Sequence, residues 1–194
     1  MTKYEKLFFD VDDTLIDFKA AEKVALPIVF KEFKMDFTEE VESYYKTLNR
    51  QLWTALEHGE ITREQLLERR FRETMQHFGQ KVDGREMDEQ YRSLLVNTVV
   101  LIDGAEQVLS QLSEKYELYI VTNGMIKTQH DRLKAANLTP YFKRIFVSEE
   151  TNYQKPQIEF FNYVMVNVKD FKKSTSMIIG DSFSADIVGG FNAG

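Results

Sequence analysis

The chain contains no cysteine, which excludes disulfide bonds, thiolate-bound metals and thiol nucleophiles. Only three prolines and nine glycines occur among 194 residues, too few for a collagen-like or linker-rich protein. Positive charge is also scarce, because 25 Lys and Arg residues are outnumbered by 31 Asp and Glu residues, which gives a net charge of −6. Such a surface repels the phosphates of a nucleic-acid polymer, so we expect no partner of that kind.

Long hydrophobic runs are absent as well. The longest largely apolar stretch, residues 94–102, is interrupted by Asn97 and Thr98 and is much shorter than a membrane span. At the N-terminus, the apolar residues 7–9 are followed directly by Asp10, so we expect no signal peptide. The hydrophobic content of 43% and the charged content of 29% are those of an ordinary globular protein. We therefore expect an acidic, cytoplasmic protein with no membrane partner.

The hydrophobic pattern changes along the chain in a way that indicates two kinds of structure. Residues 7–11 form a short apolar run typical of a buried strand, whereas residues 20–97 carry apolar side chains at helical spacing. In this second stretch, Thr62 and Gln65 have the spacing of a capping box, which marks the start of a helix. The pattern predicts about four helices with no strand between them, which is typical of a small helical bundle.

Aromatic and basic side chains within this helical stretch have two possible interpretations. Tyr44, Tyr45, Trp53 and Tyr91 could stack on a nucleobase, but aromatic residues at helical spacing more often pack in a core. The basic cluster at residues 69–72 is expected to form a solvated helix face, although it could also attract an anionic substrate.

Beyond residue 103, strands and helices alternate regularly, and this predicts an α/β protein with a parallel sheet covered on both faces. The expected elements are helices at 105–112, 127–136 and 159–168 and strands at 118–121, 144–147 and 177–179. We therefore predict a Rossmann-like α/β core made of residues 1–17 and 100–194, with residues 18–99 inserted as an all-helical domain.

Polar motifs follow the predicted strands at the positions where an open parallel sheet places its ligand site. Asp10 and Asp12 come directly after the first strand, where one carboxylate could act as a nucleophile or metal ligand and the other as a proton donor. The alternative is that Asp12, Asp13 and Thr14 merely form a capped turn.

The later motifs are weaker when each is taken alone. Thr122 and Asn123 offer a hydroxyl and backbone amides that suit an anionic oxygen, but an ordinary helix cap would look the same. Lys155 precedes a proline, and an isolated lysine is usually solvated surface. Asp181 and Asp186 lie about one helical turn apart after the last strand and suit a hard cation such as Mg²⁺. The four motifs together, in order and each on its own strand end or loop, favour function over chance.

This set of motifs resembles the four motifs of the haloacid dehalogenase (HAD) superfamily along essentially the whole chain. The helical insertion between the first and second motifs is similar to the C1 cap of subfamily I. Further similarity in residues 9–15, 120–124, 146–149 and 154–156 is to the YjjG/YfnB-type branch, some members of which are nucleoside 5′-monophosphate phosphatases that prefer pyrimidines. Family members normally continue past Gly194 with a further strand and helix, so we expect an uncovered sheet edge beside residues 177–179.

The resemblance implies a role for each motif residue. Asp10 would attack phosphorus and become an aspartyl-phosphate, and Asp12 would protonate the leaving oxygen and then help to deprotonate water. Thr122, the Asn123 amide and Lys155 would bind the phosphoryl group and offset its charge. Mg²⁺ would be held by Asp10, the Asp12 carbonyl and Asp181, with Asp186 beside the metal or one shell further out.

The resemblance implies a phosphomonoester hydrolase, since the dehalogenase branch needs no metal and has no acid at the position of Asp12. The expected substrates are small phosphate esters, with nucleoside 5′-monophosphates first. The alternatives are another phosphatase or a phosphomutase acting on sugar phosphates or phosphoglycolate, and a binding module without turnover.

Overall fold

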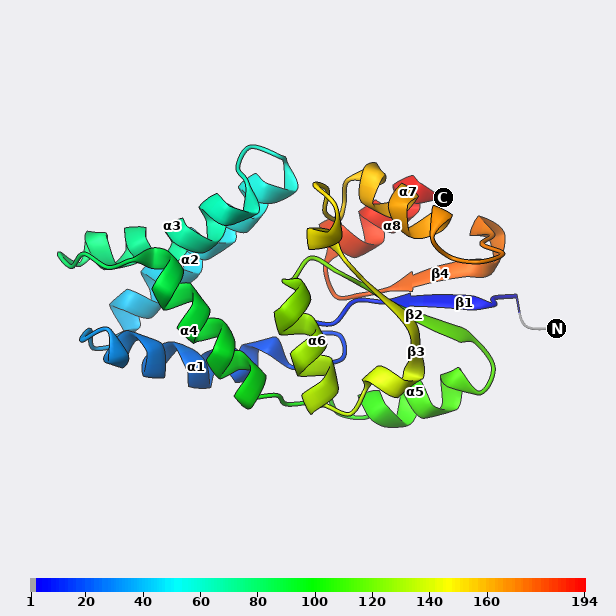
Figure 1. Ribbon diagram of the computed structural model, residues 1–194, viewed down its shortest axis with the longest axis horizontal. Coiled ribbons are helices and arrows are strands. Elements are labelled where there is room, and N and C mark those ends of the chain that lie inside the picture. Colours follow the sequence, from blue (N-terminus) through cyan, green and yellow to red (C-terminus); the bar gives the residue numbers. More distant parts are fainter. Residues whose placement is uncertain (1–2) are drawn as a thin grey trace. The chain divides into compact units, whose positions relative to one another are not determined.

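A computed structural model describes residues 3–194 of the chain (Figure 1). The strands are β1 (Lys6–Phe9), β2 (Glu117–Thr122), β3 (Phe142–Val147) and β4 (Ser176–Ile179). The helices are α1 (Phe18–Glu32), α2 (Glu39–Glu57), α3 (Arg63–His77), α4 (Gly84–Asn97), α5 (Ala105–Ser113), α6 (Ile126–Ala135), α7 (Ile158–Val166) and α8 (Gly189–Ala193). Short segments η1 (Thr139–Tyr141), η2 (Ser148–Glu150) and η3 (Lys173–Thr175) are 3₁₀-helical, and η4 (Phe183–Val188) is π-helical.

Contacts within the chain divide it into two compact units. The α/β unit contains the residues up to Ala20 together with Val99–Gly194, and the helical unit is Ala21–Thr98. All four strands belong to the first unit.

The four strands form one parallel sheet in the order β3-β2-β1-β4, which confirms the α/β prediction. The chain runs outward from β1 through β2 to β3 and then returns to place β4 on the other side of β1. The strand order therefore reverses at β1. In open parallel sheets, ligands bind at the carboxyl ends of the strands where such a reversal occurs. The topology therefore places a candidate ligand site at the residues that follow β1.

Successive side chains of each strand point to opposite faces of the sheet, so its continuous apolar runs bury both faces. Helices α5 and α6 pack on one face and α7 on the other (Figure 1). Buried side chains of the first face include Leu7, Phe9, Leu109, Ile120 and Leu133. Those of the second face include Phe8, Tyr119, Val121, Phe160 and Val164. These two layers of packing hold the strand ends in register.

The helical unit begins its helices where capping residues satisfy first-turn amides. Thr38 and Asp83 cap α2 and α4, and Thr62 with Gln65 forms the predicted capping box at α3. Tyr45 and Tyr91 are fully buried, as core packing predicts.

The prediction of a solvated basic face is wrong for Arg70. This side chain is buried, donates two hydrogen bonds to the buried carboxylate of Asp88, and lies over the ring of Tyr91. Helical spacing places Arg70 on the same face as Leu66 and Thr74, four residues before and after it, which are also buried. Within residues 3–194, every helix is too short or too polar to span a lipid bilayer.

Candidate active site

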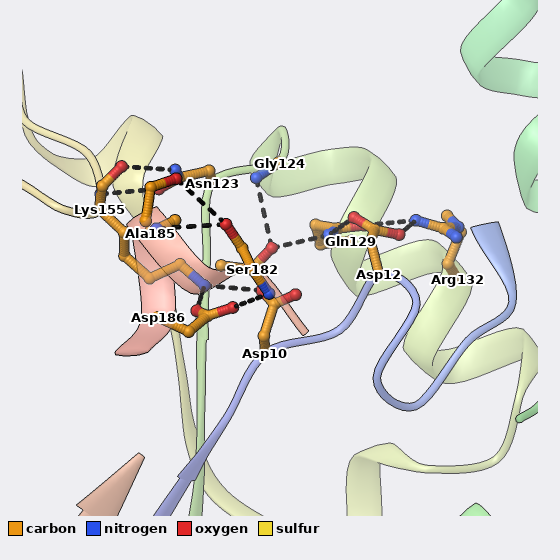
Figure 2. A network of polar contacts seen from close by, with 12 residues as sticks. Asp10, Asp12, Asn123, Gly124, Gln129, Arg132, Lys155, Ser182, Ala185 and Asp186 are labelled. Carbon is orange, nitrogen blue, oxygen red and sulfur yellow. Dashed lines mark hydrogen bonds and ion pairs between the residues drawn. The ribbon is translucent and has the colours of Figure 1, made fainter. Parts of the chain in front are cut away.

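The acidic residue that follows β1 is the centre of the candidate site. Asp10 continues the line of the strand, because its backbone amide donates to the carbonyl of Ile179 in β4 at 2.9 Å. Its side chain is buried beside Lys155, which follows β3, and Asp186, which follows β4 (Figure 2). Asp10 therefore lies at the point where the strand order reverses.

The ammonium group of Lys155 lies between two of the predicted carboxylates. Its Nζ donates to Oδ1 of Asp10 at 2.7 Å and to Oδ1 of Asp186 at 2.5 Å, and its side chain is 2% exposed. The side chain of Asn123 fixes the Lys155 backbone through two hydrogen bonds, one to its carbonyl and one from its amide, both 2.8 Å long. Lys155 is thus a buried member of the site and not a solvated surface lysine.

Burial raises the pKa of Asp10 from 3.8 to about 7, although the positive charge of Lys155 lowers it. The neighbouring carboxylates of Asp186 and Asp12 raise it further. Burial alone would lower the pKa of Lys155, but the charges of Asp10 and Asp186 raise it above its ordinary value. Two carboxylates here share one ammonium group, which leaves negative charge for a cation to balance.

Asp10, Asp181 and Asp186 form an acidic trio, in which one carboxylate oxygen from each lies within 4.8 Å of the others. Ser182 holds Asp186 in place by donating its backbone N–H to Oδ2 at 3.1 Å. Gly180 leaves room for this carboxylate, since a Cβ there would lie 2.2 Å from Oδ2 of Asp186. The turn after β4 therefore needs glycine at this position.

The donor atoms of the acidic trio are carboxylate oxygens from three residues. A purely oxygen-based set of this kind suits a hard cation such as Mg²⁺ and not a soft metal. Both oxygens of Asp186 already accept hydrogen bonds, whereas one oxygen of Asp10 accepts none within residues 3–194, and the side chain of Asp181 is exposed. The residues fit a Mg²⁺ site in which Asp10 and Asp181 are the better-placed direct ligands.

Thr122 ends β2 with a buried hydroxyl group. Its Oγ1 accepts hydrogen bonds from the backbone N–H of Gly124 at 3.3 Å and from Nε2 of Gln129 at 2.8 Å. Since two donors occupy the oxygen lone pairs, the hydroxyl hydrogen remains to be donated to an anionic oxygen.

The carboxylate of Asp12 lies apart from the acidic trio and faces α6 (Figure 2). Its Oδ1 accepts a hydrogen bond from Nη1 of Arg132 at 2.5 Å, and its Oδ2 accepts one from Nε2 of Gln129 at 2.9 Å. The sequence prediction missed Gln129 and Arg132. Their only signal was a polar pair three residues apart, on one face of the helix that follows the Thr122 turn.

The structure thus places the seven predicted residues at or just beyond the carboxyl ends of the strands. Asp10, Lys155, Asp181 and Asp186 form one group, and Asp12 and Thr122 are joined to each other through Gln129. Asn123 contributes its side chain to the Lys155 loop, a contact that the sequence did not predict.

Comparison with known proteins gives consistent matches. A family model described as haloacid dehalogenase-like hydrolase matches residues 7–194. The chain is 39% identical to the pyrimidine 5′-nucleotidase PynA of Streptococcus pneumoniae, covering 98% of this chain and 81% of that protein. It is 29% identical to the pyrimidine 5′-nucleotidase YjjG of Escherichia coli, covering 99% and 84% of the two chains. A crystal structure of YfnB from Bacillus subtilis bound to magnesium, 44% identical, superposes with a TM-score of 0.97 and covers 100% and 86% of the chains.

Proposed function

Because this chain belongs to the haloacid dehalogenase-like hydrolase family, we propose that it is a Mg²⁺-dependent phosphomonoester hydrolase that uses Asp10 as its nucleophile. The observation that supports the proposal most directly is the position of Asp10. Its carboxylate accepts a hydrogen bond from the ammonium group of Lys155 and also belongs to the acidic trio. Phosphoryl transfer requires positioning and positive charge around the transferred group, and this arrangement provides both.

Asp10, Asp181 and, one shell further out, Asp186 would hold the Mg²⁺ ion, together with the backbone carbonyl of Asp12. When bound, the cation supplies charge that stabilises the phosphoryl oxygens and draws the proton from Asp10. The magnesium bound to the similar YfnB structure supports the choice of Mg²⁺ as the cation.

In the first half of the reaction, a carboxylate oxygen of Asp10 attacks phosphorus and the bond between phosphorus and the leaving oxygen breaks. The leaving oxygen takes a proton from Asp12, so the alcohol departs neutral and Asp12 becomes a carboxylate. Lys155 and the Thr122 hydroxyl donate hydrogen bonds to the phosphoryl oxygens as their charge grows.

In the second half, water attacks the phosphorus of the aspartyl-phosphate and gives a proton to Asp12. The bond between phosphorus and the Asp10 oxygen breaks, which releases inorganic phosphate and restores both aspartates. Asp12 thus acts as acid and then as base in one cycle.

Nucleoside 5′-monophosphates, with pyrimidines preferred, are the proposed substrates. The support comes from PynA and YjjG, both named pyrimidine 5′-nucleotidases and both matched along almost the whole of this chain. The site itself recognises phosphate and the leaving oxygen, which every phosphomonoester shares.

The test is a kinetic screen of the purified chain with Mg²⁺ against nucleoside monophosphates, sugar phosphates, phosphoglycolate and p-nitrophenyl phosphate. We expect turnover that disappears in a chelator, returns with Mg²⁺ and is lost in Asp10→Asn. A higher kcat/KM for a sugar phosphate than for every nucleotide would contradict the nucleotidase assignment. Full activity in the chelator would contradict the metal assignment.

A further inference from the structure

We propose that Gln129 and Arg132 are positioning residues that fix the Asp12 carboxylate for proton exchange with the leaving oxygen. This inference rests on the proposed function, because it concerns the acid and base of that reaction. Neither residue belongs to the four sequence motifs, and both reach Asp12 from the same helix, α6 (Figure 2).

Arg132 is the cationic partner of Asp12. Its side chain is 1% exposed, and Nη1 donates both to Oδ1 of Asp12 at 2.5 Å and to Oε1 of Gln129 at 2.9 Å. Among the described residues, Asp12 is the carboxylate with which it forms an ion pair. Its Nε and Nη2 are buried and have no hydrogen-bond partner in residues 3–194.

This arrangement is costly if its role is only to stabilise the fold. A buried guanidinium group with unpaired N–H groups loses hydration that one ion pair does not fully replace, and apolar residues of similar size often serve stability as well or better. A functional requirement for charge at this position explains why an arginine is buried here.

Gln129 fixes the second oxygen and links it to the phosphate-binding turn. Its Nε2 donates to Oδ2 of Asp12 at 2.9 Å and to Oγ1 of Thr122 at 2.8 Å. Gly124 leaves the space for this side chain, because a Cβ there would lie 2.6 Å from the Gln129 side chain. Both oxygens of Asp12 are therefore restrained, and their position is tied to that of Thr122.

The restraint matters because Asp12 lies on a loop and its side chain is 34% exposed. A free carboxylate there could rotate between several rotamers or turn toward the cation at the acidic trio. Held by α6, it stays outside the trio and available for proton transfer, while Lys155 serves Asp10 and Asp186. Displacement of a catalytic group by about 1 Å can lower a rate by about 100-fold.

The experiment compares two esters that differ in their need for an acid. An aryl phosphate with a good leaving group, such as p-nitrophenyl phosphate, departs with little protonation, whereas a nucleoside monophosphate needs a proton on its leaving alkoxide. For Arg132→Met and Gln129→Met, we expect kcat with the nucleotide to fall about 10-fold to 100-fold and kcat with the aryl ester to fall less than about threefold. Arg132→Lys, which restores a donor and the charge, should recover part of the nucleotide rate.

A matched control lies on the same helix. Lys127→Met removes an exposed lysine that pairs with Asp131 and touches none of the site residues named above, so both rates should stay unchanged. Combining Arg132→Met or Gln129→Met with Asp12→Asn should produce no further change in the ratio of the two rates, since the group that they position is already lost. Circular dichroism and melting curves establish whether each variant folds. If Arg132→Met does not fold, the test is made with Gln129→Met.

Equal losses of kcat with both esters would overturn the inference and leave the proposed function standing. The same would follow if Arg132→Met or Gln129→Met changed the ratio of the two rates equally in the wild type and in Asp12→Asn. A folded wild-type chain that hydrolyses neither ester with Mg²⁺ would instead overturn the proposed function. The two failures are therefore distinguishable.

Discussion

At the residue scale, two buried cationic side chains contact different carboxylates of the site. Lys155 contacts Asp10 and Asp186 on one side, and Arg132 contacts Asp12 on the other. Two aspartates separated by one residue in the sequence thus have different charged neighbours. Different surroundings can give identical side chains different roles, and the roles proposed here are those of a nucleophile and a proton carrier.

Asparagine substitutions should separate these two roles. Asp10→Asn removes the attacking oxygen, so we expect no turnover of any ester, because the ordered partners of Asp12 hold its carboxylate elsewhere. Asp12→Asn should still form the aspartyl-phosphate from p-nitrophenyl phosphate, because this leaving group needs little protonation. Rapid-quench detection of phosphoenzyme measures the difference, and equal residual bursts in the two variants would contradict it.

The raised pKa of Asp10, about 7, predicts how the protein responds to pH. Without metal, the folded protein keeps this proton up to about pH 7, whereas the unfolded chain loses it near 3.8. Stability from this group is therefore greatest below 3.8 and is lost as the pH rises through 7. Mg²⁺ reverses this dependence, because it binds the ionised carboxylate and must displace the proton at lower pH.

We therefore expect the rise in Tm caused by Mg²⁺ to be larger at pH 8 than at pH 5.5. Differential scanning fluorimetry at fixed ionic strength measures this rise in Tm. The buffers contain no Ca²⁺, and the protein in a chelator is the reference. An equal rise at both pH values would show that Asp10 is already ionised in the metal-free protein.

Sequence reasoning located the motif residues because each follows a strand, and parallel strands bring their carboxyl ends together. It could not find Gln129 and Arg132, since their role depends on which face of α6 meets Asp12. The same limit explains Arg70, whose charge suggested solvent although its helix face is buried. Contacts between elements distant in sequence require the packed structure.

At the element scale, the turn between β4 and η4 depends on the absence of a side chain at Gly180. A Cβ there would lie 2.2 Å from the Asp186 carboxylate, which could then no longer reach both Lys155 and Ser182. We expect Gly180→Ala to lower kcat at least about 10-fold and to weaken Mg²⁺ binding, because misplacing a charged partner changes the geometry of the reacting groups. Steady-state kinetics and Mg²⁺ titration measure both effects. The substitution Gly79→Ala strains a left-handed backbone (φ +80°), but its added Cβ would meet no neighbouring atom within 4 Å, so it serves as a control for destabilisation without a contact to Asp186.

In the helical unit, α3 and α4 are joined by the ion pair between Arg70 and Asp88, both of them buried, and Arg92 donates to the other oxygen of Asp88 at 2.6 Å. Asp88→Ala leaves the Arg70 charge buried without its carboxylate, so we expect a loss of about 3–5 kcal/mol in the free energy of unfolding. Glu42→Ala breaks the exposed pair with Lys46 in α2 and should cost less than about 1 kcal/mol. Urea denaturation of both variants tests the contrast, and similar losses would contradict it.

At the scale of the whole molecule, the alternation of strands and helices was enough to predict the parallel sheet, because buried parallel strands have continuous apolar sequences. The strand order was not readable from the pattern, since β4 could pair with either edge of the preceding strands. Its position beside β1 creates the reversal and brings Asp181 and Asp186 to Asp10. The site therefore depends on a pairing that only the three-dimensional structure shows.

The same scale raises the question of how one phosphate ester is chosen over another. The groups proposed to act in the α/β unit would bind the phosphate, the cation and the leaving oxygen, and every phosphomonoester has the same phosphate and leaving oxygen. We infer that residues of the helical unit, Ala21–Thr98, decide which ester is preferred. A single discriminating contact is worth about 1–3 kcal/mol, or roughly 10-fold to 200-fold in kcat/KM.

Alanine substitution of the exposed side chains of this unit, one at a time, should therefore change the ranking of nucleotides and sugar phosphates in some variants by at least about 10-fold. The rate with p-nitrophenyl phosphate should stay within about threefold of the wild type, because its small leaving group needs little recognition. Variants that lower the rate equally with every substrate are misfolded or catalytically impaired, and melting curves identify the misfolded ones. If no folded variant changes the ranking, the choice of substrate resides in the α/β unit and the role inferred for the helices is wrong.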